Sequence, residues 1–308
     1  MLVFNHGWTR INTDVGKRSG RNTPRRRAPP LFLEEFLRRP WRFAMSERLK
    51  AAAARLGLAL PVGDAPEAWA ELAVDVFLRP PAPPRVPPRE QNYLAGALRG
   101  TVATRAGELA MWTWGEADRP LVLLAHGWAG RGSQLGAFAG PLVVAGFRVV
   151  TFDGPGHGES PGTEAHVPLF AQCIADIGEK LGGMHAVIGH SMGAASAAMA
   201  TMMGLMPRGL VLIAPPLSHR GRVERVAARL ELEPAVRELF LRAAERRVGW
   251  KDEDVDMRVV ARRAPCPVVV FHDPEDEDTA FKESAEFVAI WSGARLVPCP
   301  GRGHFRIW

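Results

Sequence analysis

Three of the segments expected to be strands contain runs of large apolar residues only, and these runs constrain the fold more than any other feature. They cover residues 121–124, 211–213 and 268–271. A strand with one face in water alternates apolar and polar side chains, whereas a strand covered on both faces is continuously apolar. Segments with the length and composition of helices lie between these stretches. The pattern therefore predicts an α/β protein with a mostly parallel sheet and helices on both of its faces.

The same pattern, followed along the whole chain, predicts an eight-stranded sheet. The expected strands are residues 98–104, 108–114, 120–125, 147–152, 185–189, 209–214, 267–272 and 294–298. The first two are separated by a short turn and are expected to form an antiparallel hairpin at one edge. A chain of 308 residues, 47% of them hydrophobic, can bury the core of one large domain of this kind.

The net charge of +6 suggests an acidic partner, but the distribution of the charge does not. Residues 1–44 contain ten basic and three acidic residues, a net charge of +7, so the rest of the chain carries −1. We expect this basic segment to be a disordered extension, because it lacks hydrophobic periodicity. Met45 opens a more regular sequence and fits a translation start, so the extension is expected to be dispensable. No nucleic-acid partner is therefore expected.

Several classes of protein are excluded by what the sequence lacks. No apolar run reaches the roughly 18 residues that a transmembrane helix needs, so we expect no membrane span. The arginines at 25–27 are soon followed by acidic residues, so we expect no export signal. Three cysteines without a CxxC pair indicate free thiols and no zinc site. These features predict a cytoplasmic protein.

A helical segment precedes the predicted sheet. Residues 45–88 contain two expected helices, at 46–56 and 66–78, and end in a proline-rich stretch. The large apolar residues of the second helix share one face, which is typical of packing on a main domain; they are Trp69, Leu72, Val76 and Phe77. The proline-rich stretch is expected to be a stiff linker. It would separate these helices from an α/β domain that covers residues 89–308.

Residues 189–193 read Gly-His-Ser-Met-Gly and match the pattern Gly-x-Ser-x-Gly. They follow an expected strand and precede an alanine-rich helix. In this strand–turn–helix setting the pattern exposes a nucleophilic serine at the start of the helix, and the glycines allow the sharp turn. A structural serine in an ordinary glycine-rich turn is the alternative, which the setting disfavours. Ser191 is therefore the candidate nucleophile.

Two further positions are candidates for binding the charge that such a nucleophile would generate. His126-Gly127-Trp128 ends an expected strand, and Met192 directly follows Ser191. The main-chain N–H groups of Trp128 and Met192 are therefore candidates for an oxyanion hole, which stabilises a tetrahedral intermediate. We also expect the Trp128 indole to wall the substrate pocket, together with Leu217.

Residues 152–160 form a glycine-rich loop, Phe-Asp-Gly-Pro-Gly-His-Gly-Glu-Ser, after the next expected strand. A loop of this kind can bind phosphate, but no Gly-Lys-Ser/Thr follows it and no Gly-x-Gly-x-x-Gly opens a helix. Nucleotide binding is therefore not expected. Asp153 and His157 are expected to brace the loop by hydrogen bonds.

These three motifs, in this order and each after a strand, resemble the α/β-hydrolase superfamily over residues 97–308. The resemblance implies a catalytic triad in the order serine, acid, histidine. In the loop after the seventh strand, the family pattern selects Asp276 as the acid, and Asp273 and Asp278 remain candidates. His304 follows the last strand and is the only histidine beyond that loop, so it is the expected general base.

Residues 217–263 lie where many relatives insert a lid, and we expect a small helical lid there. The segment is rich in arginine and glutamate. Pairing between oppositely charged residues of the same helix is the expected reason. A preference for an anionic substrate is the alternative explanation for the arginines.

These residues together predict a serine hydrolase that cleaves a small carboxylic ester through an acyl-enzyme intermediate. The expected partner is a small-molecule ester. No metal and no organic cofactor is expected, because a histidine activates the serine. An acyltransferase or thioesterase with the same triad is an alternative, and so is a catalytically weak binding protein on this fold. The oligomeric state stays open.

Overall fold

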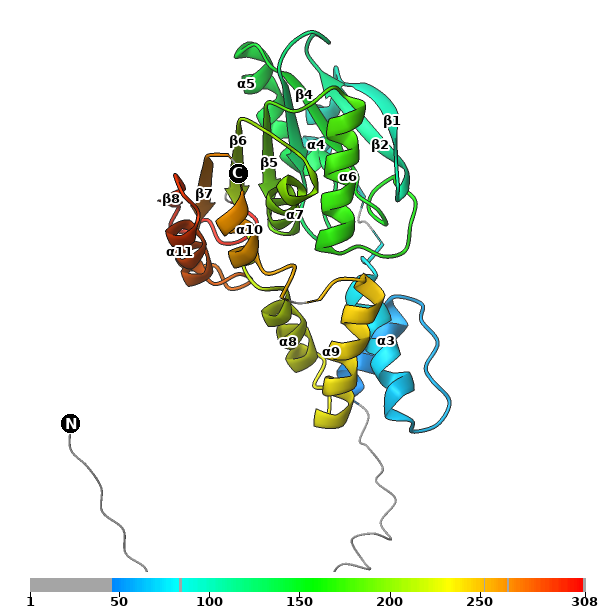
Figure 1. Cartoon of the computed structure of the whole chain (residues 1–308). Coiled ribbons are helices and arrows are strands. Elements are labelled where there is room, and N and C mark those ends of the chain that lie inside the picture. The colour runs from blue at the N-terminus through cyan, green and yellow to red at the C-terminus, as the bar shows by residue number, and fades with distance from the viewer. Residues whose placement is uncertain (1–45, 83–84, 252, 265, 307–308) are drawn as a thin grey trace, which may run out of the picture. The chain divides into compact units, whose positions relative to one another are not determined.

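The computed structural model describes residues 46–82, 85–251, 253–264 and 266–306 (Figure 1). The predicted basic extension, residues 1–44, lies outside them. Within the described residues, no helix combines the length and the apolar character that crossing a membrane requires. All three cysteines carry free thiols.

The described residues form one sheet of eight strands in the order β1-β2-β4-β3-β5-β6-β7-β8. Strand β2 is antiparallel to its neighbours β1 and β4, and every other pairing is parallel. The predicted mostly parallel sheet and its edge hairpin are confirmed, and each strand end lies within one residue of its expected place. The strands are β1 Leu98–Thr104, β2 Gly107–Trp114, β3 Leu121–Ala125, β4 Arg148–Phe152, β5 Ala186–His190, β6 Gly209–Ile213, β7 Val268–His272 and β8 Arg295–Pro298.

Strand β3 explains why the central strands are continuously apolar. Leu121, Leu123 and Ala125 belong to one core cluster, whereas Val122 and Leu124 belong to another. Successive side chains of a strand point to opposite faces, so both sets must be apolar when both faces are covered. The helices that pack on or beside the sheet are α4 Pro88–Leu94, η1 Gly132–Phe138, α5 Ala139–Val144, α6 Val167–Lys180, α7 Met192–Ala200, η2 Thr201–Met203, α10 Met257–Arg263 and α11 Phe281–Ile290.

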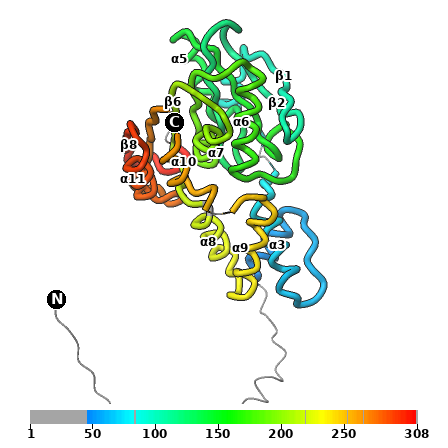
Figure 2. Tube along the Cα trace, in the orientation of Figure 1, coloured from blue at the N-terminus to red at the C-terminus, as the bar shows by residue number. Residues whose placement is uncertain are grey.

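Four helices form a separate apolar cluster, called the cap below. They are α2 Glu47–Arg55, α3 Pro66–Leu78, α8 His219–Arg229 and α9 Pro234–Val248. Figure 2 shows α3 and α9 side by side, and the rings of Phe77 and Phe240 meet edge-on with 5.9 Å between their centres. The N-terminal helices therefore pack with the lid helices. The apolar face of α3 thus packs on helices of the segment 89–308, and the boundary expected at the proline-rich stretch stays a prediction.

The cap includes only part of the segment expected to form the lid. Helix α10, at the end of that segment, packs beside α7 and α11. Its residues Met257, Val260 and Ala261 are buried in the core cluster that includes Leu121 of β3. Of the segment expected to form the lid, the cap therefore includes α8 and α9.

Arginine–carboxylate pairs on the cap occur both within helices and between them. Two pairs have the expected i,i+4 spacing, and they are Arg220–Glu224 at 3.1 Å and Arg242–Glu238 at 2.5 Å. Other pairs join α9 to α3, and they are Arg246–Glu71 at 3.0 Å and Arg247–Asp75 at 2.7 Å. Pairing within helices therefore explains only some of the arginines.

Candidate active site

The candidate nucleophile lies on a sharp turn between β5 and α7. Ser191 has φ 50° and ψ −116°, and its N–H donates to the carbonyl of Ile213 on β6 at 2.8 Å. A positive φ costs a residue other than glycine on the order of 1–3 kcal/mol, so the surrounding structure must hold it in place. The turn follows the carboxyl end of β5, and Ser191 lines a cavity there.

Two glycines make this turn sterically possible. A Cβ atom at Gly193 would collide with the main-chain oxygens of Ala125, the last residue of β3, and of His126, which follows it. A Cβ atom at Gly189 would lie 2.6 Å from the oxygen of Gly193, closer than real Cβ atoms approach. The close packing of β3, β5 and α7 therefore requires glycine on both sides of Ser191.

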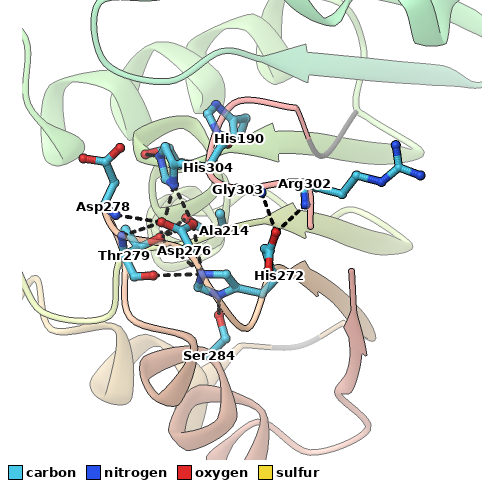
Figure 3. Close-up of polar contacts among 12 residues, drawn as sticks. His190, Ala214, His272, Asp276, Asp278, Thr279, Ser284, Arg302, Gly303 and His304 are labelled. Atoms are coloured by element: carbon cyan, nitrogen blue, oxygen red, sulfur yellow. Dashed lines mark hydrogen bonds and ion pairs between the residues drawn. The ribbon is translucent and has the colours of Figure 1, made fainter. Parts of the chain in front are cut away.

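The three residues expected to form a triad lie in a hydrogen-bonded line. The Oγ atom of Ser191 is 3.0 Å from Nε2 of His304. Nδ1 of His304 is 2.7 Å from Oδ2 of Asp276 (Figure 3). They follow β5, β8 and β7, so three strand ends bring them together. When the His304 proton is on Nδ1, the serine hydroxyl donates to Nε2 and the ring donates to the carboxylate.

Of the three candidate acids, only Asp276 contacts His304. Its Oδ1 accepts from the N–H groups of Asp278 and Thr279 at 2.8 and 2.9 Å, and its Oδ2 accepts from the Thr279 hydroxyl at 3.0 Å. Burial by itself raises the pKa of this carboxyl, but hydrogen bonds from His272, His304 and Thr279 outweigh it and hold the pKa far below its usual value. Asp276 is therefore ionised at neutral pH.

A second histidine, which the sequence did not reveal, contacts the same carboxylate. Nε2 of His272 is 3.2 Å from Oδ2 of Asp276 and 3.0 Å from the carbonyl oxygen of Thr279, and Nδ1 is 2.6 Å from Oγ of Ser284. A carbonyl oxygen can only accept, so Nε2 carries the proton and the Ser284 hydroxyl donates to Nδ1. The only sequence signal is a histidine at the end of an apolar strand.

Two residues anchor the loop that carries His304. Asp273 accepts from the N–H group of Arg302 at 2.5 Å and from that of Gly303. On the other side, Nε2 of His190 donates to the carbonyl oxygen of His304 at 3.0 Å. Asp273, a candidate acid in the sequence, therefore positions the loop and does not contact the His304 ring.

Two main-chain N–H groups are the expected oxyanion donors. Among the described residues, no acceptor bonds the main-chain N–H of Trp128 or of Met192. Both residues line the cavity with Ser191. Gly127 lets the turn after β3, which carries Trp128, approach the nucleophile. A Cβ atom at Gly127 would lie 3.2 Å from Cβ of Ser191 and 2.9 Å from Nδ1 of His190. Two free donors beside a serine hydroxyl can bind a developing oxyanion.

Three other histidines near the site are buried and neutral. Nε2 of His126 accepts from the N–H of Gly154 at 2.9 Å, and Nε2 of His157 accepts from that of Ala129 at 3.1 Å. Burial lowers the pKa of His126 to about 4 and those of His157 and His190 to about 3. The prediction that His157 braces the glycine-rich loop is confirmed.

Asp153 braces the same loop from its start. Its side chain accepts from the N–H groups of Gly132 at 2.7 Å and Glu159 at 2.8 Å, and its main-chain oxygen accepts from the Ser160 hydroxyl at 2.5 Å. Burial raises the pKa of this carboxyl, although the two N–H donors oppose the change. The expected bracing role of Asp153 is confirmed.

Ser191 and His304 open into a cavity of about 450 Å³, a volume typical of small-molecule sites. Trp128 lines it, as expected. Leu217 was expected there too, but it is not among the lining residues and is only 2% exposed. Its N–H donates to the Glu283 carboxylate at 2.9 Å, and its side chain packs in the core. The prediction of Leu217 at the substrate is corrected.

The cap supplies a large part of the cavity wall. Val76 and Phe77 come from α3, and Arg222, Val226 and Arg229 come from α8. The sequence placed the apolar face of α3 against the main domain and gave no reason to place it at the site. Because α3 and α8 lie far apart in the chain, no local sequence pattern predicts that they form one wall of the cavity.

Several solved structures share the fold of this chain. Solved structures of similar fold include a hydrolase from Pseudomonas aeruginosa PA01, with 23% identity, a TM-score of 0.53 and coverage of 67% of this chain and 91% of that one. The thioesterase domain of the curacin biosynthetic pathway has 18% identity, a TM-score of 0.52 and coverage of 68% and 95%. Est1E from Butyrivibrio proteoclasticus, with ferulic acid bound, has 18% identity, a TM-score of 0.53 and coverage of 67% and 91%. These structures show that the chain has an α/β-hydrolase fold, as the resemblance implied.

The particular family follows from the sequence match. The family model described as serine aminopeptidase, S33, matches residues 116–276, more than half of the 308 residues. The chain therefore belongs to this hydrolase family. The matched segment includes Ser191 and Asp276, whereas His304 and α3 lie outside it. No curated protein matches the chain.

Proposed function

We propose that the protein is a serine hydrolase that cleaves small carboxylic esters by acyl transfer to water. The main support is the hydrogen-bonded line from Ser191 through His304 to Asp276, whose first two members open into the cavity. Membership of a hydrolase family supports the reaction class. The cavity volume and the apolar wall made by Trp128 and Met192 support an ester of modest size.

In the proposed reaction, Oγ of Ser191 attacks the ester carbonyl while its proton moves to Nε2 of His304. Ionised Asp276 stabilises the imidazolium through the Nδ1–H bond. The N–H groups of Trp128 and Met192 hold the oxyanion. His304 then gives the proton to the leaving alcohol, and the acyl group stays on Ser191. A water molecule attacks this acyl-enzyme by the same steps, which releases the carboxylic acid and restores the serine.

The test removes the nucleophile. Ser191→Ala is expected to lower kcat for 4-nitrophenyl butyrate by at least about 10³-fold, because the whole line depends on that hydroxyl. It is also expected to abolish labelling by a fluorophosphonate probe. Ser196→Ala is the matched control, since Ser196 is buried on the same helix and donates to the Val167 carbonyl at 3.2 Å. Wild-type turnover in the Ser191 variant would refute the assignment.

The same measurements separate the proposal from other uses of this fold. A protein that only binds ligands would not be labelled at Ser191. An acyltransferase would be labelled, but an added alcohol or amine would receive most of the acyl group in place of water. A thioesterase would hydrolyse a butyryl thioester much faster than the matching ester. A panel of esters, thioesters and amides of equal acyl length therefore defines the acceptor and the leaving group.

A further inference from the structure

Helix α8 carries a row of three arginines at the cavity. Arg222, Arg225 and Arg229 have the spacing of one helix face, and Arg222 and Arg229 line the cavity. Two carboxylates pair with this row: Glu283 is 3.1 Å from Nη1 of Arg225, and Asp278 is 3.4 Å from Nη2 of Arg229. Among the described residues, three cations of this row face two anions, so one positive charge is uncompensated there.

Arg222 is the third cation of this row, and neither of the two carboxylates pairs with it. Among the residues described, its guanidinium makes neither a hydrogen bond nor an ion pair. Burial, followed by Arg225 and Arg229, lowers its pKa, and Asp278 alone opposes them. A guanidinium nevertheless stays protonated at ordinary pH. Its partial burial without a counterion is unfavourable, and a bound anion would relieve this.

Arg225 gives a second sign of an unfilled anion site. Its Nη2 atom is buried and has no hydrogen-bond partner among the described residues. The second oxygen of its partner Glu283 is already used, because it accepts from the Leu217 N–H at 2.9 Å. The acidic groups around α8 are therefore too few for its guanidinium donors.

We propose that the ester substrate carries a carboxylate, which Arg222 binds while the ester carbonyl lies at Ser191. This proposal rests on the proposed ester hydrolysis. A planar carboxylate matches the two-donor edge of a guanidinium, and a single negative charge balances the single uncompensated positive charge. Val76, Phe77 and Trp128 make other parts of the cavity wall apolar. The substrate is therefore an ester whose apolar body ends in a carboxylate.

The first test compares two esters that differ only in this charge. 4-Nitrophenyl hexanoate and the 4-nitrophenyl monoester of adipic acid have the same acyl length. The wild type is expected to have the higher kcat/KM for the adipate monoester. Arg222→Gln is expected to lower the ratio of the two kcat/KM values at least about 10-fold, and Arg222→Lys to recover part of it. An unchanged ratio in Arg222→Gln would overturn the proposal.

Arg220→Gln is the matched control for that ratio. Arg220 is on the same helix, but it is exposed and pairs with Glu224 at 3.1 Å, and it does not line the cavity. Its removal changes the net charge of the protein as much as the loss of Arg222. The wild-type ratio is therefore expected in this variant. An equal fall in both variants would show a long-range charge effect and would contradict a carboxylate bound at Arg222.

Binding without turnover distinguishes failure of this proposal from failure of the proposed function. In Ser191→Ala protein, calorimetry is expected to show adipic acid monoamide binding at least about 10-fold more tightly than hexanamide. Adding Arg222→Gln is expected to remove the difference. Equal affinities of the Ser191→Ala protein for the two amides would overturn the proposal that the substrate carries a carboxylate. Absence of fluorophosphonate labelling in the wild type would instead overturn the hydrolysis on which it rests.

Discussion

Five donors converge on the carboxylate of Asp276, two on Oδ1 and three on Oδ2. A carboxylate held in this way cannot rotate, so it fixes the tautomer and the orientation of His304. Its pKa in the folded protein lies below the ordinary aspartate value near 3.9. The stabilisation it gives is therefore present above about pH 4 and is lost only as the pH falls toward the folded-state pKa.

The contact between His272 and this carboxylate gives a prediction for a positioning residue. His272→Phe removes a donor from Oδ2 of Asp276 and is expected to lower kcat about 10-fold while KM changes little, because Asp276 then holds His304 less firmly. His272→Gln, whose amide can donate from the place of Nε2, is expected to recover most of kcat. Ester hydrolysis by both variants checks this. Equal kcat in the two variants would show that the lost hydrogen bond is not the cause.

The residues of the site differ in how far the sequence could predict them. Ser191 has a local pattern whose glycines are sterically required, and His304 follows from chain order. Asp276 was selected only by the family pattern, since Asp273 and Asp278 have the same chemistry within the same loop. His272 acts through a contact that exists only in the folded loop. A histidine at the end of an apolar strand does not by itself predict a contact with Asp276.

At the scale of elements, the site depends on how closely β3, β5 and α7 approach one another. The sequence predicts these elements well, because continuous apolar runs mark the buried strands and small residues mark the helix that packs on them. It predicts the cavity wall poorly. The sequence indicates that α3 has an apolar face. It does not indicate which surface that face covers, because this depends on α8 and α9, whose apolar residues lie far along the chain.

Alanine substitutions at two glycines test this packing. Gly193→Ala places a Cβ against the carbonyl oxygens of Ala125 and His126, so we expect the free energy of unfolding to fall by at least about 1–3 kcal/mol. Gly100→Ala on β1 meets nothing within 4 Å and is expected to raise it by about 0.5 kcal/mol. Urea unfolding of both variants gives the comparison. A Gly193 variant as stable as the wild type would contradict the close approach.

At the scale of the whole molecule, buried neutral histidines connect stability to pH. His126, His157 and His190 have folded-state pKa values of about 3 to 4, below their ordinary value of 6.5. Between these values the unfolded chain binds more protons than the folded protein, so stability falls as the pH falls. Above about pH 7.5 all three rings are almost entirely neutral in both states, and their contribution is constant.

The free energy of unfolding is therefore expected to fall steeply between pH 6.5 and 4, by up to about 1.4 kcal/mol per pH unit for each ring. His126→Gln keeps an acceptor near Nε2 for the Gly154 N–H and removes one titrating ring. Its slope is expected to be shallower by that amount, whereas its pH dependence above about pH 7.5 should match the wild type. Urea unfolding at a series of pH values measures both. Equal slopes below pH 6.5 would refute the assignment.

The order of synthesis gives the cap a further consequence. Glu71 of α3 and its partner Arg246 of α9 are 175 positions apart. At about 5–20 residues per second, roughly 10–35 s pass between their appearance on the ribosome. During that interval the apolar face of α3, which includes Trp69 and Leu72, has no α9 to cover it. The cavity wall is therefore completed late in synthesis. His304 is synthesised later still, so Ser191 is present in the nascent chain well before its proposed general base.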